Sequence, residues 1–278
     1  MRIGVTVFLT DQTIGPAELG RALAERGFQS YYAPEHTHIP ISRATPAPLG
    51  EPLPDYYSRT LDPFVALAAV AAAAPGIRVG TGICLAAQHD PLLLAKTVAT
   101  LDLVTGGNVD LGVGFGWNKE EMADHGVDFG TRRDKVRETV LAMKELWGNE
   151  VASYHGDHVS FDPSWSWPKP AAGSVPVLIG GAAGPKLFKA VVDYADGWMP
   201  IGGRGLTQAM PVLRAAAQEA GRDPDTLRVV PFGTEPTPGK MEHYQALGIE
   251  EIVFNVPSAP ADRILRVLDD YARYIDRE

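Results

Sequence analysis

Short apolar runs alternate with helical segments eight times along the chain, and this alternation constrains the fold more than any other feature. Strands are expected at residues 2–8, 28–33, 77–85, 108–115, 175–181, 196–203, 226–233 and 250–257. Helix signals, such as Asp-Pro at the start or glycine at the end, mark the segments between them, at residues 16–27, 62–76, 90–107, 117–147, 184–195, 206–221, 238–248 and 259–276. Several strand runs are almost wholly apolar, which is typical of parallel strands covered on both faces.

Eight such units predict an α/β fold, a (β/α)8 TIM barrel that forms one domain over residues 1–278. The alternative is a doubly wound open sheet, for which fewer strands per domain are expected. Two segments are longer than the loops that a (β/α)8 barrel requires. A Pro-rich insertion after strand 2 covers residues 34–63, and an insertion before strand 5 covers residues 148–172 with an alternation typical of a hairpin. A loop as long as the first is typical of a lid or a substrate wall.

Charge and cysteine content narrow the class of partner. The net charge is −9 and no basic block exceeds a few residues, so nucleic acid is not an expected partner and a small-molecule substrate is. Cys84 is the only cysteine, which excludes an intrachain disulfide and favours a cytoplasmic location. We see no signal peptide and no apolar run long enough to span a membrane, so no membrane partner is expected.

The stretch APEHTHIP, which follows the second expected strand, raises the possibility of a metal site. In a barrel the active site lies at the carboxyl ends of the strands, which is where His36 and His38 fall. A metal would need further histidine or carboxylate ligands from other strand ends. Those ends carry mostly glycine and apolar residues, and His89 is the only other histidine near one of them. We therefore expect no metal, and treat a metal-dependent hydrolase as the weaker hypothesis.

Two runs of small residues at strand ends point to an anionic ligand. LIGGAAGP places Gly180, Gly181, Ala182, Ala183 and Gly184 before a helix that begins with proline, and GFGWN opens the same rim after strand 4. Glycine permits close backbone approach, and a helix N-terminus favours an anion. Together they indicate an elongated, phosphate-bearing ligand, although each alone is equally compatible with a tight turn. Positive charge could come from Arg132, Arg133, Lys135, Arg137 and Arg204, or these could be solvated surface residues.

The order and spacing of several segments give the chain a resemblance to the luciferase-like monooxygenase superfamily, over nearly its whole length. These segments are YYAPEH, VGTGICLAAQHDPLLLAKTVATLD, GNVDLGVGFGWNKEEM, TRRDKVRETVLAMKELW and VPVLIGGAAGPKLFKAVVDYADGWMP. Within that superfamily the chain is most similar to the branch that uses the deazaflavin coenzyme F420. The resemblance implies a (β/α)8 barrel, a cytoplasmic oxidoreductase and, because relatives are often dimers, a homodimer.

The resemblance also implies roles for individual residues. His36 matches a histidine that exchanges a proton beside the deazaflavin ring, with Glu35 as its acidic neighbour. A non-prolyl cis peptide that backs the ring is expected at Gly82–Ile83. The next residue, Cys84, lies beside a position where some flavin-using relatives carry cysteine, or it is a small buried apolar residue. The remaining cofactor-binding positions are Gly114, Phe115, Gly116, Trp117 and Asn118 for the ring, and residues 180–184 for the phosphate. Some F420-dependent members carry glutamate at the position of Trp117, so a sugar-phosphate substrate is not implied here.

These observations lead to one main hypothesis and two alternatives. The main hypothesis is an F420-dependent oxidoreductase that transfers a hydride to or from a small apolar or aromatic substrate, with His36 as proton donor or acceptor. The substrate class rests on the Pro-rich insertion and on tryptophans that could line the pocket or pack in the core: Trp117, Trp165, Trp167 and Trp198. The alternatives are a monooxygenase that uses reduced FMN on the same fold, and a non-catalytic flavin-binding protein.

Overall fold

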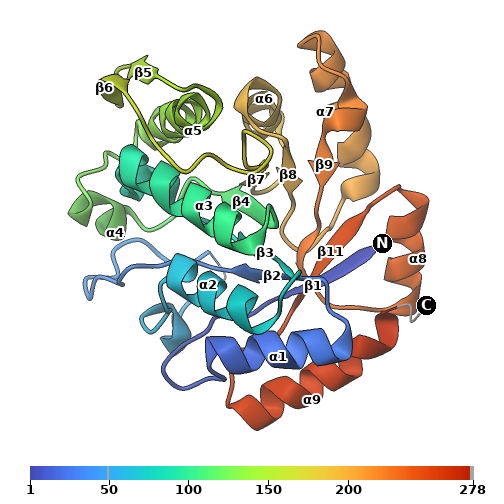
Figure 1. Cartoon of the computed structure of the whole chain (residues 1–278). Helices are drawn as coiled ribbons and strands as arrows, with labels where there is room; N and C mark the ends of the chain where they lie inside the picture. Colours follow the sequence, from blue (N-terminus) through green and yellow to red (C-terminus); the bar gives the residue numbers. More distant parts are fainter. Residues whose placement is uncertain (49, 276–278) are drawn as a thin grey trace.

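The computed structural model describes residues 1–48 and 50–275. Its main sheet contains β1 (Arg2–Thr6), β2 (Ser30–Ala33), β3 (Arg78–Thr81), β4 (Val109–Val113), β7 (Val177–Gly180), β8 (Gly197–Met199), β9 (Arg228–Val229), β10 (Phe232–Thr234) and β11 (Glu251–Asn255). These nine strands pair in the order β10-β11-β1-β2-β3-β4-β7-β8-β9 (Figure 1). Neighbouring strands run parallel throughout, so all their carboxyl ends lie at one edge.

The sheet curls until its two ends meet in one short segment of chain. Its end strands, β9 and β10, are separated only by Val230 and Pro231. Val230 N–H donates to the carbonyl of Trp198, and Val253 N–H donates to the carbonyl of Pro231, both at 2.9 Å. The seventh strand was expected to be continuous over residues 226–233, and this was wrong: Pro231 has no N–H to donate, so the strand divides in two.

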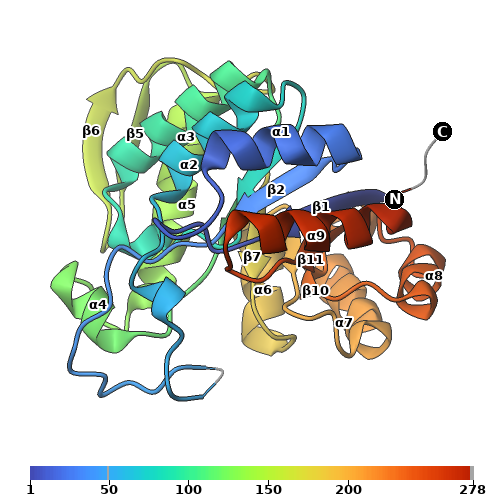
Figure 2. The same cartoon turned by 90° about the horizontal axis from the view of Figure 1, so that it is seen from below.

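Helices cover the outer face of the curled sheet (Figures 1 and 2). They are α1 (Pro16–Arg26), α2 (Pro63–Ala73), α3 (Pro91–Thr105), α5 (Arg132–Gly148), α6 (Pro185–Tyr194), α7 (Leu206–Glu219), α8 (Pro238–Ala246) and α9 (Ala261–Tyr271). A further helix, α4 (Lys119–Asp124), lies at the carboxyl edge of the sheet instead. Asp62 and Asp90 cap α2 and α3 by accepting from the N–H groups of residues 65 and 93, as the Asp-Pro signals predict. Among the described residues, no helix combines the length and apolar composition needed to cross a membrane.

Three of the expected helices differ in their details. The long helical region at residues 117–147 is divided into α4 and α5, because Gly126, with φ of +69°, takes the left-handed conformation between them. The helix expected at residues 206–221 ends earlier: α7 stops at Glu219, with Pro211 in its interior. The last expected helix, residues 259–276, is shorter: α9 ends at Tyr271 and a 3-10 turn follows at Ala272–Tyr274. Residue 276 lies outside the described residues.

The two segments expected to exceed a bare barrel have different structures. Residues 148–172 contain an antiparallel hairpin of β5 (Ala152–His155) and β6 (Ser160–Ser164). The turn of this hairpin is held by Glu138 of α5, which accepts from the N–H groups of residues 157, 158 and 159. Residues 34–63, apart from residue 49, which is not described, form one 3-10 turn at Asp55–Tyr57 and otherwise run irregularly until α2 begins. In Figure 2 this segment passes beside α4.

Two hydrophobic clusters determine where a ligand can lie. The larger one fills the space between sheet and helices. The smaller one comprises Tyr32, Leu178, Met199, Val230 and Val253, with Ile83 and Phe232 packed against it. Below it, at the amino ends of the strands, Asp110 accepts from Arg78, Arg228 and the Tyr32 hydroxyl. The middle of the sheet is thus occupied by side chains, so we looked for the site at the carboxyl edge.

Candidate active site

His36 follows β2 at the carboxyl edge and is paired with a carboxylate from another part of the chain. Its Nδ1 lies 2.8 Å from Oε2 of Glu121, a residue of α4, and the two side chains are only 7% and 1% exposed. The other oxygen of Glu121 accepts from the backbone N–H of Thr37 at 3.2 Å. A carboxylate that accepts at both oxygens places the ring proton on Nδ1, which leaves Nε2 as the atom able to exchange a proton.

Aromatic side chains from three segments surround this histidine. The rings of Tyr57 and Trp117 lie 5.2 and 5.8 Å from the His36 ring, and 6.3 Å from each other. Phe8, which follows β1, packs against Tyr57 at 5.0 Å and against Tyr56 at 4.7 Å. Both tyrosines belong to the Pro-rich segment. Part of this segment therefore forms a wall of the site, and the wall is aromatic.

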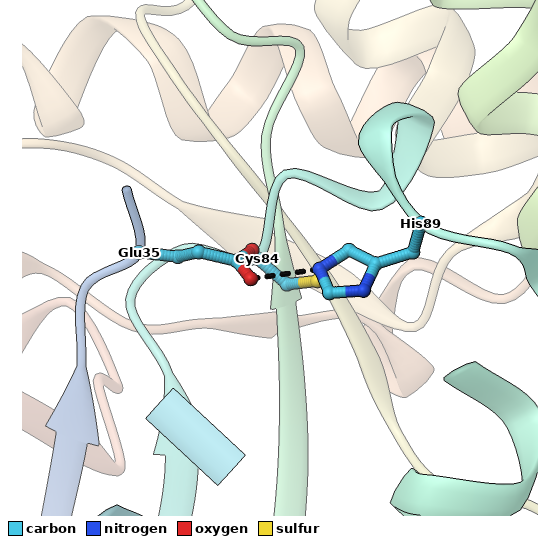
Figure 3. A group of neighbouring side chains, drawn as sticks. All are labelled: Glu35, Cys84 and His89. Carbon is cyan, nitrogen blue, oxygen red and sulfur yellow. Dashed lines mark hydrogen bonds and ion pairs between the residues drawn. The ribbon is translucent and has the colours of Figure 1, made fainter. Parts of the chain in front are cut away.

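Glu35 does not contact His36, so its expected role as the acidic neighbour that orients this histidine was wrong. Adjacent side chains on an extended backbone point to opposite sides, and Glu35 turns toward the segment after β3 (Figure 3). One of its oxygens lies 2.7 Å from Nε2 of His89, and the other accepts from the Leu85 N–H at 2.5 Å. Cys84 lies beside the same carboxylate, with its sulfur within 4.8 Å of a carboxylate oxygen.

The three side chains of Figure 3 form a buried polar cluster. Burial opposes charge on Glu35, but bonds from His89, Leu85 and Cys84 outweigh it and lower the pKa of the carboxyl. Burial also opposes charge on His89, whose pKa is nevertheless raised by Glu35 and, at longer range, by Asp62. The pKa of the Cys84 thiol is raised by burial and by Glu35. These pKa shifts favour an ion pair of Glu35 and His89 beside a neutral Cys84 thiol.

The same three residues are also able to hold a metal ion, since their ligand atoms lie within 4.8 Å of one another. Sulfur, imidazole and carboxylate together suit zinc. However, Glu35 and His89 bond to each other directly at 2.7 Å, and a metal ion held between them would have to replace this bond. The arrangement therefore fits a hydrogen-bonded cluster better than a metal centre.

The peptide bond between Gly82 and Ile83 is cis, as the resemblance implies. The Ile83 side chain lies over two glycines. A Cβ on Gly114 would be 2.2 Å from Ile83 Cδ1, and one on Gly180 would be 2.7 Å from Ile83 Cγ2. Because β4 and β7 are neighbours, Gly114 and Gly180 lie side by side, so the two small-residue runs do meet. Both glycines make room for Ile83, and we call Gly82, Ile83, Gly114 and Gly180 the platform.

The remaining residues expected to bind the cofactor have more varied positions. Ala182 and Ala183 are exposed, and Gly184 precedes α6, whose N-terminus has neither a side-chain cap nor an acidic residue in its first turn. Gly116 has φ of +71°, and Phe115 lies under the Arg133 guanidinium at 3.9 Å. Asn118 caps α4 through its oxygen, and its buried Nδ2 has no partner among the described residues. This end of the sheet thus combines an open helix N-terminus with a free buried donor.

Several side chains considered for the site lie elsewhere. Trp165 and Trp167 are 76% and 60% exposed after β6, so their expected place in a substrate pocket was wrong. Their hairpin lies over α5, outside the sheet. Trp198 is buried in the core, where its Nε1 donates to the carbonyl of Gly181. Arg137 pairs with Asp193 at 2.6 Å and is therefore engaged, whereas Arg132 stacks on the Phe129 ring at 3.5 Å.

His38 belongs to a separate, more exposed network at the start of the Pro-rich segment. Its Nε2 lies 2.9 Å from Asp124, and its Nδ1 lies 2.9 Å from the Thr37 hydroxyl. The same hydroxyl lies 2.7 Å from His125 Nε2. These contacts fasten the segment to α4, which is the helix that carries Glu121.

Sequence reasoning missed Glu121. The pattern Asn118-Lys119-Glu120-Glu121 is a capping box, in which the glutamate normally returns to the cap residue. Asn118 does cap the helix, but Glu121 instead reaches across to His36 and Thr37. The useful signal was a glutamate in the first turn of a helix at the carboxyl edge of the barrel.

The fold and site together define a class of protein: a curled parallel α/β sheet with a buried histidine–carboxylate pair at its carboxyl edge. The sequence model of the family described as luciferase-like monooxygenase matches residues 15–235. The chain therefore belongs to the luciferase-like monooxygenase family, and the resemblance read from the sequence is confirmed.

Individual relatives refine this assignment. An uncharacterised protein of Mycobacterium tuberculosis is 41% identical over 281 residues, covering 100% of this chain and 97% of its own length. The F420-dependent hydroxymycolic acid dehydrogenase of the same species is 28% identical over 79% of this chain and 57% of its own. The solved structure of an F420-dependent secondary alcohol dehydrogenase, with an F420-acetone adduct, superimposes with a TM-score of 0.78 at 19% identity, covering 99% of this chain and 98% of that one. That likeness is one of fold.

Proposed function

We propose that this protein is an F420-dependent oxidoreductase, which transfers a hydride between F420 and a small apolar or aromatic organic substrate. The observation that carries the proposal is the buried pair of His36 and Glu121, which leaves Nε2 available within an aromatic wall beside the platform. The names of relatives that use F420 support the choice of cofactor.

The residues at this edge fit a flat ring that carries a phosphate chain. The platform offers Ile83 over two glycines, as backing for a ring. Asn118 has a buried N–H group without a partner among the described residues, which an acceptor on a ring could satisfy. The uncapped N-terminus of α6, preceded by residues 180–184, would hold the phosphate. Phe115, Gly116, Trp117 and Cys84 remain predicted cofactor neighbours.

The chain's own residues would manage the proton while bound F420 supplies or accepts the hydride. When a substrate hydroxyl is oxidised, His36 Nε2 accepts its proton, and Glu121 stabilises the imidazolium that results. In the opposite direction the same atom returns the proton to a carbonyl oxygen. Tyr57, Trp117 and Phe8 exclude water from this exchange, and their rings favour an apolar or aromatic substrate.

Two alternatives use the same fold. A monooxygenase that uses reduced FMN is favoured by the family's description, and the platform would suit either ring. A non-catalytic flavin-binding protein is disfavoured by a buried proton-transfer pair, which such a protein would not need. We further propose that β9 and β10 count as one strand of a (β/α)8 barrel, that residues 1–278 form one domain, and that the protein is a homodimer.

Paired titrations test the proposal. Purified wild type and the His36→Ala variant are each titrated with F420 and with FMN, and binding is followed by ring absorbance. We expect both proteins to bind F420 more tightly than FMN, and His36→Ala to lose turnover far more than binding. Tighter binding of FMN would favour the monooxygenase, and equal turnover in the variant would remove His36 from the chemistry.

A further inference from the structure

Glu35 and His89 have no part in the proposed proton transfer, yet they form a hydrogen-bonded pair close to His36, in which Glu35 is buried and His89 partly buried. The Glu35 carboxylate bonds to Leu85 and His89 and lies beside Cys84, and all three residues belong to the turn between β3 and α3. Glu35 is 4% exposed. The carboxylate thus joins the end of β2 to this turn and to nothing else among the described residues.

This turn is continuous with the platform. Cys84 N–H donates to the carbonyl of Gly112 at 2.7 Å, and Gly114 N–H donates to the carbonyl of Cys84 at 3.0 Å. Ile83 points inward onto the small hydrophobic cluster, whereas the next side chain, Cys84, points outward to Glu35. The inner face of the turn is therefore set by packing, and its outer face is held by Glu35.

Glu35 is also bonded by its backbone to His36, and this has a geometric consequence. Glu35 bonds to the turn that continues the platform, and the next residue, His36, carries the ring that exchanges the proton. We propose that Glu35 and His89 are positioning residues that hold the platform at a fixed place relative to His36. This inference rests on the proposed function for its meaning, but the structural link itself does not depend on which cofactor binds.

The chemistry of the pair suits a rigid link. A buried carboxylate is stable only when its oxygens are satisfied, and here each oxygen has a donor: the Leu85 N–H and the His89 ring. Charge-assisted bonds of this kind are shorter and stronger than neutral ones. His89 is anchored in turn: it precedes Asp90, the cap of α3, and its ring packs edge-on against Phe64 of α2 at 6.0 Å. The pair therefore ties the turn to two helices.

Two variants and one control test the link without any cofactor. Glu35→Ala removes every acceptor, whereas Glu35→Gln keeps an oxygen for the Leu85 N–H. Leu268→Ala, in the buried part of α9, serves as a control for general loss of stability. We expect hydrogen–deuterium exchange in peptides covering residues 82–89 to become about tenfold faster in Glu35→Ala. A change of this size corresponds to the loss of one charge-assisted hydrogen bond. Glu35→Gln should restore most of the protection, and Leu268→Ala should leave these peptides close to wild type.

The F420 titration then tests positioning as opposed to simple structural support. Glu35→Ala and His89→Ala should each raise the dissociation constant for F420 about tenfold, while Leu268→Ala, at a similar loss of thermal stability, should leave it within about twofold. Unchanged exchange and unchanged affinity in Glu35→Ala would overturn the inference.

Metal analysis of the purified protein tests the remaining explanation, which is that Glu35, Cys84 and His89 bind a metal ion. Stoichiometric zinc that disappears in Cys84→Ser would also overturn the inference, because the cluster would then be a metal site. If wild type binds neither F420 nor FMN, the proposed function fails, but the exchange experiment still decides whether Glu35 holds the turn.

Discussion

Replacing Glu121 with glutamine tests the histidine pair most sharply, because the structure determines how the new amide must lie. In wild type one carboxylate oxygen faces Nδ1 of His36 and the other accepts from the Thr37 N–H. An amide nitrogen cannot accept a hydrogen bond, so the glutamine oxygen must stay with Thr37. Its NH2 group then faces Nδ1, which must become an acceptor. The ring proton is driven to Nε2, and His36 can no longer act as a base there.

The expected magnitudes follow from the chemistry of the pair. A charge-assisted bond contributes about 1.5–3 kcal/mol and a neutral one about 1 kcal/mol, so Glu121→Gln should lower the free energy of unfolding by about 1–2 kcal/mol. Loss of a correctly protonated general base costs about 10²–10⁴-fold in turnover. The effect on turnover should therefore far exceed the effect on stability.

The assay is nitrogen-15 NMR of histidine-labelled protein, combined with turnover of F420. The His36 ring should carry its proton on Nδ1 in wild type and on Nε2 in Glu121→Gln. Glu120→Gln, one residue away on the same helix, is the matched control and should leave the ring unchanged. An unchanged His36 tautomer in Glu121→Gln, or an equal loss of turnover in the control, would refute the reasoning.

Three further predictions concern stability and packing. Gly114→Ala should destabilise the fold by about 1–3 kcal/mol because its Cβ would meet Ile83, and Gly184→Ala, with open space around it, should change stability by less than about 0.5 kcal/mol; urea unfolding checks both. Burial opposes the charge on His89, but Glu35 raises the pKa of this histidine above 6.5. The contribution of the charged His89 ring to the stability of the fold is therefore complete below pH 6.5, and it is lost as the pH rises through the pKa of His89 in the folded protein. The difference in unfolding free energy between wild type and His89→Gln should thus be larger at about pH 6 than at about pH 9. Arg228→Ala should lower the free energy of unfolding by about 3–5 kcal/mol, because the buried carboxylates of Asp110 and Glu251 each lose a partner. The affinity for F420 should not change.

The order of the elements could be predicted from the sequence because its signals are local. Asp-Pro starts, glycine stops and apolar runs each act over a few residues, and they located the helices α2 and α3 well. The break between α4 and α5 was missed because Gly126 costs little within a helical pattern, and only packing decides whether the helix continues. Strand 7 was expected to be continuous because the missing N–H of Pro231 matters only once both neighbouring strands are known.

The candidate site shows the limit of local reasoning more clearly. His36 was found because strand ends are a small set of positions. The resemblance implied Glu35 as its acidic neighbour, but neighbouring residues on an extended chain face opposite sides, and Glu35 bonds to His89 instead. The true partner, Glu121, is 85 residues away along the chain. Nothing in a single sequence identifies a contact at that separation, and the same holds for the joining of Glu35 to His89.

The most direct test of the central claim is whether reduced F420 gives up its hydride to a carbonyl compound in the absence of dioxygen. Purified protein is mixed anaerobically with reduced F420 and a set of small ketones and aldehydes, and the return of the oxidised ring is followed by absorbance. We expect one oxidised F420 for each carbonyl reduced, at a rate that dioxygen does not change and that His36→Ala lowers by at least about 100-fold. The contradicting result is no oxidation by any carbonyl, together with turnover of reduced FMN that begins only when dioxygen is admitted.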